Sequence, residues 1–310
     1  MSFLQDLLLF ALKAHASDIH IVAGMPPLLR VHTQLEEAKG YAPVTPEMAE
    51  AFVKEMIGEK RFATLVEKRD IDFSTTAPSL GPAMGRFRVN AHYQRDTIAI
   101  AFRAISDKVP ELSTLNLPPM VERLVDLPRG LILVTGQTGS GKSTTLASMI
   151  DAMNQRYSYH VITIEDPIEY MIRSNKCVVE QRELGSDVTS FGSGLRHALR
   201  QDPDIILVGE MRDLETTSAA ITAAETGHLV LSTLHTQNAS QTIERIIDIY
   251  PAEQQNQIRA MLSNTLQAVI SQSLFKRVDV SGMVPACEIM VCTPAIRNCI
   301  RENRIHEIPN

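Results

Sequence analysis

A glycine-rich segment that lies between an apolar run and a helical stretch constrains the fold of this chain more than any other feature. Residues 136–143 read GQTGSGKS, which fills every position of the P-loop motif G-x-x-x-x-G-K-[ST]. Residues 131–134 before the motif predict a buried strand, and residues 144–150 after it predict a helix. In that context backbone amides and the helix N-terminus face an anion. The motif therefore predicts an α/β fold that binds a nucleotide, and a glycine-rich turn without a ligand is the alternative.

The motif also predicts what single side chains do. Lys142 is expected to reach the β- and γ-phosphates of ATP, and the Ser143 hydroxyl is expected to bind Mg²⁺. The residues expected to contact the nucleotide are Gly136, Gln137, Thr138, Gly139, Ser140, Gly141, Lys142, Ser143 and Thr144.

The pattern of predicted elements differs between the two parts of the chain. Its 310 residues suffice for about two domains at ~150 residues per domain. Residues 1–108 mix helical patterns with short alternating strands, which indicates a small α+β domain with an antiparallel sheet. The proline-rich residues 109–119 predict a linker. In residues 120–310 apolar strand candidates alternate with helical stretches, which predicts a parallel sheet with helices on both faces. After about residue 240 the pattern predicts a mostly helical region.

Composition excludes several classes of protein. The net charge of −6 argues against a broad surface for nucleic acid, so no nucleic-acid partner is expected. The four cysteines form no C-x-x-C pair, which argues against a structural zinc site. The apolar residues 7–12 are far short of the ~20 residues that span a bilayer, so no transmembrane segment is expected. No secretory signal is evident either, and a cytoplasmic location is the simplest expectation.

Two acidic segments follow predicted strands. Glu165, Asp166 and Glu169 come directly after the strand at 161–164, where carboxylates can orient the attacking water or hold the water shell of a metal. A solvated acidic loop is the alternative for this segment. Glu210 follows the apolar run 205–208 in the Walker B arrangement, and we expect it to meet Mg²⁺ through water.

Residues on the opposite side of these strands are expected to differ in role. Asp204 precedes its strand and therefore should lie away from the nucleotide, as a structural residue. His228 and His235 bracket the next strand, so they cannot share one metal ion. His235 follows the carboxyl end and can approach the γ-phosphate, whereas His228 is open to a structural or a functional interpretation.

The ordered set of segments resembles the secretion ATPase superfamily, and within it the PilT-type type IV pilus retraction ATPases. The resemblance rests on the P-loop, on ITIEDPIEY at 162–170, on LRQDPDIILVGEMRD at 199–213 and on TGHLVLSTLH at 226–235. It is strengthened by ASDIHI at 16–21, GRFRVNA at 85–91 and AIRNCIRE at 295–302.

The resemblance implies an N-terminal PAS-like domain followed by a RecA-like ATPase domain, with ATP and Mg²⁺ bound between them in a homohexameric ring. It implies a motor that drives pilus retraction and twitching motility, placed in the cytoplasm beside the inner-membrane platform protein of the pilus machine. Glu169 matches the family's catalytic glutamate, and Glu210 its Walker B glutamate, so the expected catalytic residues are Glu169, Glu210 and Lys142. Arginines of the N-terminal domain reach the phosphates in this family. The matching positions are Arg88 and Arg103, with Arg86 and Arg95 as alternates.

The chain departs from the family pattern where Cys299 replaces a leucine, and where Arg95-Asp96-Thr97 lacks the usual glycines. The family also continues into a further helical segment beyond the position of Asn310. Residues 295–302 predict a helix with an apolar stripe and with Arg297 and Arg301 on the other side, which we interpret as a force-transmitting element.

Four alternatives remain at this stage. The first is an accessory, PilU-like retraction ATPase. The second is a pilus assembly or type II secretion ATPase, although those commonly carry a four-cysteine zinc element. A nucleic-acid motor of RecA type and a nucleotide-binding scaffold without hydrolysis are the others.

Overall fold

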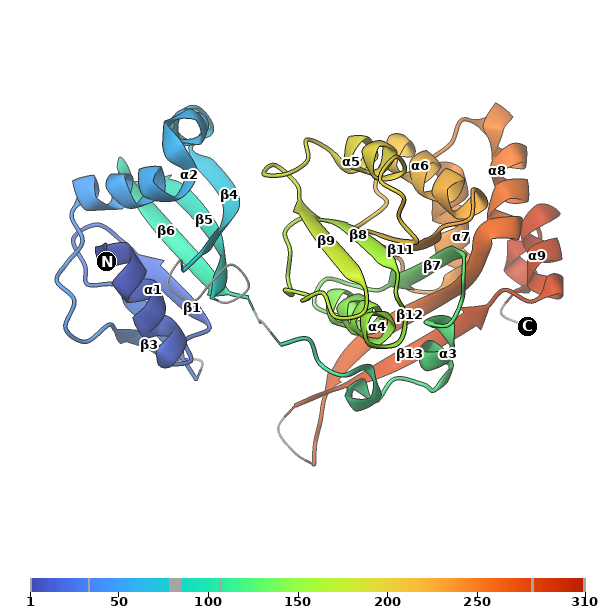
Figure 1. The fold of residues 1–310 in the computed structure, drawn as a ribbon, viewed down its shortest axis with the longest axis horizontal. Coiled ribbons are helices and arrows are strands. Elements are labelled where there is room, and N and C mark those ends of the chain that lie inside the picture. Colours follow the sequence, from blue (N-terminus) through green and yellow to red (C-terminus); the bar gives the residue numbers. More distant parts are fainter. Residues whose placement is uncertain (1, 33, 78–84, 106–107, 280–281, 309–310) are drawn as a thin grey trace. The chain divides into compact units, whose positions relative to one another are not determined.

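The computed structural model describes residues 2–308 except 33, 78–84, 106–107 and 280–281. By their contacts the residues form two compact units (Figure 1). The first comprises Met1–Lys108 and Glu169–Met171, and the second comprises Val109–Ile168 and Ile172–Asn310. Each unit has its own sheet and its own hydrophobic core.

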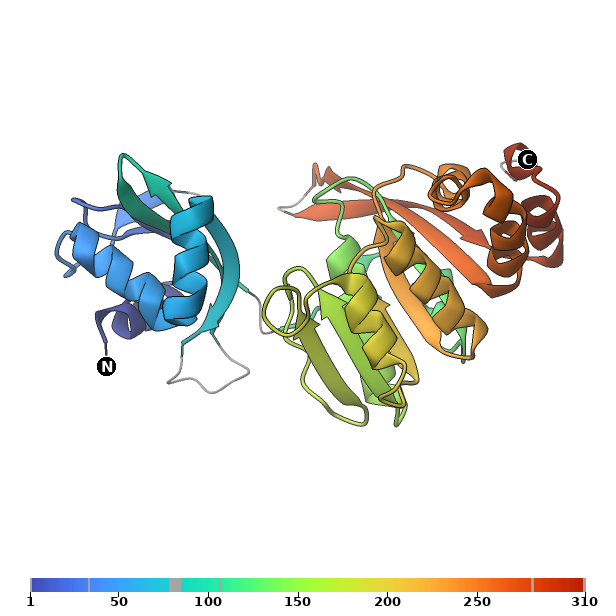
Figure 2. The ribbon, with the colours of Figure 1, turned by 90° about the horizontal axis from the view of Figure 1, so that it is seen from above.

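The described residues of the first unit build a six-stranded antiparallel sheet in the order β3-β2-β1-β6-β5-β4, with α1 and α2 packed against it (Figure 2). Thr45 caps α2 by accepting a hydrogen bond from the Met48 amide, and Gly58 interrupts the helix with φ of 71°. Gly58 therefore divides α2 into two helical segments. The elements are α1 (Phe3–Lys13), β1 (Asp18–Ile21), β2 (Leu28–Val31), β3 (Gln34–Glu37), α2 (Pro46–Lys68), β4 (Asp70–Thr76), β5 (Arg86–Gln94) and β6 (Thr97–Ala104).

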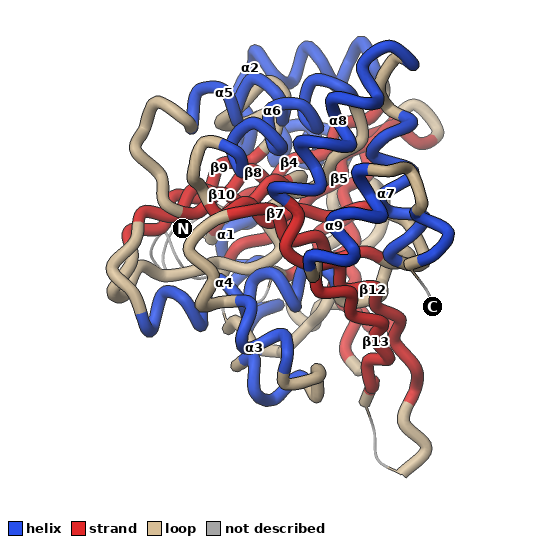
Figure 3. The backbone as a smooth tube through the Cα atoms, turned by 90° about the vertical axis from the view of Figure 1, so that its right-hand side faces the viewer, coloured by secondary structure: helices blue, strands red, loops and turns tan. Residues whose placement is uncertain are grey.

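The second unit is built on a seven-stranded sheet within the described residues, in the order β13-β12-β7-β11-β10-β8-β9. Figure 3 shows α5, α6 and α8 on one face of this sheet and α3 and α4 on the other. The elements are α3 (Met120–Leu124), β7 (Gly130–Thr135), α4 (Lys142–Arg156), β8 (His160–Glu165), β9 (Val178–Glu183), α5 (Phe191–Ala198), β10 (Ile205–Val208), α6 (Leu214–Glu225), β11 (Leu229–Leu234), α7 (Ala239–Asp248), α8 (Ala252–Thr265), β12 (Leu266–Lys276), β13 (Met283–Val291) and α9 (Pro294–Arg301).

The central strands explain why the sequence pattern was readable. β7, β10 and β11 are buried at every residue, as expected for parallel strands covered by helices on both faces. β10 pairs in parallel with β8 and β11, and β11 pairs in parallel with β7, so their carboxyl ends meet at one edge. The P-loop follows β7 at this edge. The predicted parallel sheet with helices on both faces is confirmed.

The predicted helical character after residue 240 is wrong for one segment. β12 and β13 form an antiparallel hairpin, and β12 also pairs in parallel with β7. No glycine or proline separates α8 from β12, so no local signal marks the change from helix to strand. The pairing of β12 with β7 joins segments more than a hundred residues apart in the chain, and this contact decides the conformation.

The predicted linker at 109–119 is not extended throughout. Residues Leu112–Leu115 form a short 3-10 helix, and Leu112 is buried. The Ser148 hydroxyl of α4 donates a hydrogen bond of 2.7 Å to the Pro110 carbonyl, which anchors the segment to the second unit. A second 3-10 turn covers Ile305–Glu307. In the described part of the chain, no helix combines the length and the apolar character that a membrane crossing requires.

Candidate nucleotide-binding site

The P-loop connects the carboxyl end of β7 to the first turn of α4, as the motif predicts. Gly141 precedes the helix with φ of 88°, a left-handed conformation that glycine adopts without strain. At Gly136 a side chain would collide with the carbonyl oxygen of Gln272 on β12, so the loop passes directly over that strand. The predicted order of strand, loop and helix is therefore present. The loop also packs against β12, a contact that the sequence did not predict.

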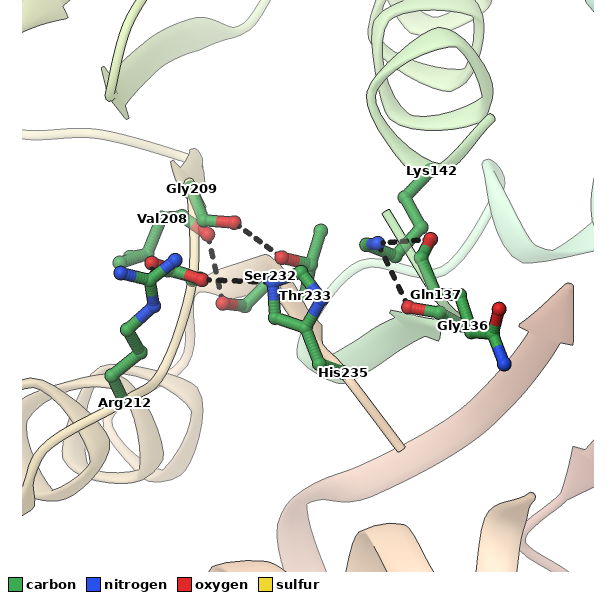
Figure 4. Close-up of polar contacts among 10 residues, drawn as sticks. Gly136, Gln137, Lys142, Val208, Gly209, Arg212, Ser232, Thr233 and His235 are labelled. Atoms are coloured by element: carbon green, nitrogen blue, oxygen red, sulfur yellow. Dashed lines mark hydrogen bonds and ion pairs between the residues drawn. The ribbon is translucent and has the colours of Figure 1, made fainter. Parts of the chain in front are cut away.

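Lys142 lies at the first position of α4 and is 9% exposed. Its Nζ donates hydrogen bonds of 2.9 Å to the Gly136 carbonyl and 3.0 Å to the Gln137 carbonyl, so the side chain folds back over the loop (Figure 4). The Ser140 hydroxyl is buried and has no hydrogen-bond partner among the described residues. Ser143 is half-buried in the first turn of the helix. A charged donor, an unpaired hydroxyl and a helix N-terminus together fit a phosphate group.

Glu210 and His235 meet at the same edge of the sheet. Glu210 follows β10 and His235 follows β11, and the His235 Nε2 lies 3.2 Å from the Glu210 Oε2 (Figure 4). The other carboxylate oxygen pairs with Arg212, whose side chain is mostly exposed. The Glu210 side chain is only 13% exposed, and the Arg212 guanidinium places a positive charge beside it.

Hydroxyl side chains align the ends of β10 and β11. Ser232 donates a hydrogen bond of 2.7 Å to the Val208 carbonyl, and Thr233 donates one of 2.6 Å to the Gly209 carbonyl (Figure 4). These bonds continue past the end of β10, where regular pairing stops, and hold the backbone that carries Glu210. Sequence reasoning missed Arg212, Ser232 and Thr233. The polar pair within an otherwise apolar strand was the available signal.

The acids after β8 lie in different environments. Glu165 ends the strand and is half-buried, and it accepts hydrogen bonds from the Thr163 hydroxyl at 2.6 Å and from the Gln181 amide at 3.0 Å. Glu169 is exposed in the loop that joins β8 to β9. Glu183, which sequence reasoning did not consider, is 2% exposed and accepts a hydrogen bond from the Ile168 amide. Glu165 is thus held in place, and Glu169 is accessible.

Asp204 and His228 lie at the amino edge and bind backbone groups. Asp204 accepts a hydrogen bond of 2.8 Å from the His160 amide, which confirms its predicted structural role. The His228 Nδ1 lies 2.9 Å from the Ala223 carbonyl and therefore donates to it, at the C-terminal end of α6. Of the two interpretations left open for His228, the structural one agrees with these contacts.

Arg88 and Arg103 lie directly opposite each other on β5 and β6. Arg88 is exposed, whereas Arg103 forms an ion pair of 3.0 Å with Asp18. Burial raises the pKa of Asp18, but hydrogen bonds from Ser17 and Arg103 outweigh it and hold that pKa below its ordinary value. Of the alternates, Arg86 donates to the Ser74 hydroxyl and Arg95 lies in the turn between β5 and β6.

The helix predicted at 295–302 is present as α9, but Arg297 does not lie on a solvated face. Its guanidinium donates hydrogen bonds to the carbonyls of Ser263 and Asn264, at 2.7 and 2.9 Å, and to the Gln267 side chain. The final carbonyls of α8 have no donors within that helix, and the Arg297 guanidinium supplies the donors. Arg301, by contrast, is exposed.

A model of the family described as type II/IV secretion system protein matches residues 1–306. The chain belongs to this family. It is 48% identical to the type IV pilus retraction ATPase PilT of Pseudomonas aeruginosa over 303 residues, which is 98% of this chain and 86% of that protein. It is 38% identical to the type IV pilus ATPase PilU of the same organism over 304 residues, covering 98% of this chain and 78% of PilU.

Among solved structures, the pilus retraction motor PilT with bound ADP superposes with a TM-score of 0.91 at 47% identity. The match covers 100% of this chain and 89% of that chain. These likenesses confirm the predicted family and the predicted fold class, an α/β RecA-like ATPase domain with a smaller N-terminal PAS-like domain of α+β type. ADP in the related structure also supports use of a nucleotide by this family.

Proposed function

We propose that this chain hydrolyses ATP to drive retraction of a type IV pilus. The observation that carries the proposal is the P-loop at the carboxyl edge, with Lys142 in the loop and Glu210 beside His235 at the same edge. The 48% identity to a pilus retraction ATPase over nearly the whole chain supplies the mechanical role.

The residues of the edge divide the chemistry between them. Lys142 exchanges the Gly136 and Gln137 carbonyls, which it binds now, for oxygens of the β- and γ-phosphates. Ser143 and Glu210 are the residues that would hold Mg²⁺, Ser143 directly and Glu210 through water, and the ion would neutralise charge on the phosphates. Glu169 accepts a proton from the attacking water or orients it. His235, held 3.2 Å from Glu210, contacts the γ-phosphate.

The remaining parts of the proposal concern assembly. Residues 1–108 form the N-terminal domain, 109–119 the linker and 120–310 the ATPase domain. Arg88 and Arg103 complete the phosphate site, and for this Arg103 must exchange Asp18 for phosphate. The working form is a homohexamer in the cytoplasm, bound peripherally to the inner membrane through the platform protein of the pilus machine. A symmetric ring allows such a site to be shared between subunits.

An accessory, PilU-like motor is the second candidate. Identity favours the primary motor, because it is 48% to PilT and 38% to PilU over almost the same length of this chain. The type II secretion relatives cover less of the chain, with 36% identity over 72% of it for the protein of Xanthomonas campestris. Pilus retraction in cells that carry only this protein separates the primary motor from the accessory one.

Substitution of Lys142 tests the proposal. Purified Lys142→Ala is expected to lose Mg²⁺-dependent phosphate release, because the charge that stabilises the transferred phosphoryl group is gone. Lys176→Ala, an exposed lysine of the same unit, is the matched control and should retain full activity. In a cell that lacks its retraction ATPase, the wild-type gene should restore twitching and the Lys142→Ala gene should not. Full hydrolysis by Lys142→Ala contradicts the proposal.

A further inference from the structure

Gln272 of β12 joins three parts of the ATPase unit through one buried side chain. It is 4% exposed. Its Nε2 donates a hydrogen bond of 2.8 Å to the Ser140 carbonyl in the P-loop. Its Oε1 accepts one of 2.8 Å from the Thr145 hydroxyl on α4. The partners lie 132 and 127 positions away in the chain, so no sequence motif contains this connection.

Two glycines of the P-loop approach Gln272 closely. A side chain at Gly136 would collide with the Gln272 carbonyl, and one at Gly141 would come within 2.7 Å of the Gln272 Nε2. The neighbouring Ser271 also accepts a hydrogen bond of 3.0 Å from the buried Thr135 hydroxyl, at the end of β7. The glycines of the motif therefore serve close packing against β12 as well as the phosphate site.

The two bonds bracket the residues that bind phosphate. Ser140 precedes Lys142 by two positions, and Thr145 follows Ser143 by two positions. Among neutral side chains of this length, an amide can donate to a carbonyl and accept from a hydroxyl at the same time. Loss of the amide would leave a carbonyl and a hydroxyl of the loop region without partners in a buried place.

We propose that Gln272 is a positioning residue of the nucleotide site, which holds the P-loop in its phosphate-binding curve before the nucleotide arrives. A loop that is ordered in advance loses less conformational entropy when it binds. The inference rests on the proposed nucleotide site and adds β12 to it, a strand that lies outside the P-loop and outside segments 162–170, 199–213 and 226–235. Removal of the two hydrogen bonds of the Gln272 amide should therefore weaken nucleotide binding more than it slows the chemical step.

The decisive variant is Gln272→Met, which keeps the length of the side chain and removes both hydrogen bonds. We expect KM for ATP and Kd for ADP to rise roughly tenfold, about 1.4 kcal/mol, with kcat reduced less than threefold. Gln272→Glu keeps the acceptor for Thr145 and loses the donor for Ser140, so it should also weaken binding. Ser273→Ala, an exposed neighbour on the same strand, is the control and should behave as wild type.

A double-mutant cycle with Thr145→Val separates positioning from general loss of packing. If the two hydrogen bonds of Gln272 act together, Thr145→Val combined with Gln272→Met should raise Kd no further than Gln272→Met alone. The proposal is overturned if folded Gln272→Met keeps Kd and KM within twofold of wild type while its Tm falls. It is also overturned if the effects of the two substitutions on Kd are additive. Failure of the wild-type protein to bind ADP would instead overturn the proposed function.

Discussion

The two edges of the large sheet carry the same kinds of residue with different consequences. β10 and β11 are each bracketed by polar side chains, Asp204 with Glu210 and His228 with His235. At the carboxyl edge the acid and the histidine face each other at 3.2 Å. At the amino edge each binds a backbone group instead. The position at the strand end, and not the residue type, therefore decides whether the acid or the histidine contacts another side chain or a backbone group.

The direction of the helices explains this difference. α4 begins at the carboxyl edge, so its unpaired amides and the positive end of its dipole gather there. α6 ends at the amino edge, where carbonyls lack partners and His228 supplies a donor. An anion is therefore favoured at the first edge and opposed at the second. Substitutions at the two edges test whether this contrast holds.

The largest effect is expected at Glu169. Glu169→Gln should bind ATP and hydrolyse it ~100-fold more slowly or worse, because the charge that activates water is lost while the shape is kept. Phosphate release and binding of a fluorescent nucleotide measure the two properties. Glu165→Gln is the comparison, since this acid is already bound by Thr163 and Gln181. A dead Glu165→Gln with an active Glu169→Gln would exchange the roles of the two acids.

Glu210 and Asp204 test the acids at the two ends of β10. Glu210→Gln should lower activity ~10–100-fold and raise the Mg²⁺ concentration needed for half-maximal rate, as expected for a residue that holds the metal through water. Asp204→Asn should leave the Mg²⁺ dependence unchanged, because an amide oxygen can still accept from the His160 amide. Equal shifts of the Mg²⁺ titration in both variants would remove the contrast between the edges.

The histidines should divide activity from stability. His235→Ala is expected to raise KM for ATP roughly tenfold, because the proposed contact with the γ-phosphate is lost. Its Tm should change little, because the His235 side chain is exposed and Arg212 still pairs with Glu210. His228→Ala is expected to leave KM unchanged and to cost about 1 kcal/mol of unfolding free energy, the usual value of one hydrogen bond. Kinetics and thermal unfolding of both proteins decide it. A His228 variant that is stable but inactive would place function at the amino edge.

The smallest effect is expected at Asp18, in the sheet of the first unit, where a charged side chain also has a side-chain partner. Its pKa is held below the ordinary 3.8 in the folded chain, so its charged form stabilises the fold above about pH 4. That contribution disappears as the pH falls below 3.8, toward the folded pKa. Asp18→Asn should therefore reduce the unfolding free energy at pH 7 and much less at pH 3.

Urea denaturation at the two pH values measures the effect of Asp18→Asn, and Asp96→Asn in an exposed turn is the control. The same loss at pH 3 and pH 7 would show that the pair with Arg103 contributes no charge-dependent stability. In that case Arg103 would be as available as Arg88 for phosphate.

The local sequence pattern was sufficient to predict much of the fold and the residues at the carboxyl edge of the large sheet. The P-loop, the apolar strands and the acids that follow them lie within short segments, where burial and element type depend on neighbours a few positions away. Parallel strands then bring their carboxyl ends together, so the common location of Lys142, Glu210 and His235 followed from the order of elements.

Side-chain partners were decided only when the chain folded. Asp18 and Arg103 are 85 positions apart, Arg297 and Ser263 are 34 apart, and Gln272 and Ser140 are 132 apart. The hairpin of β12 and β13 likewise owes its place to the pairing of β12 with β7. Periodicity in a sequence tells which residues are buried, but a buried donor can donate to any acceptor that folding brings within about 3 Å. The packing of the P-loop against β12 was therefore decided only by the tertiary structure.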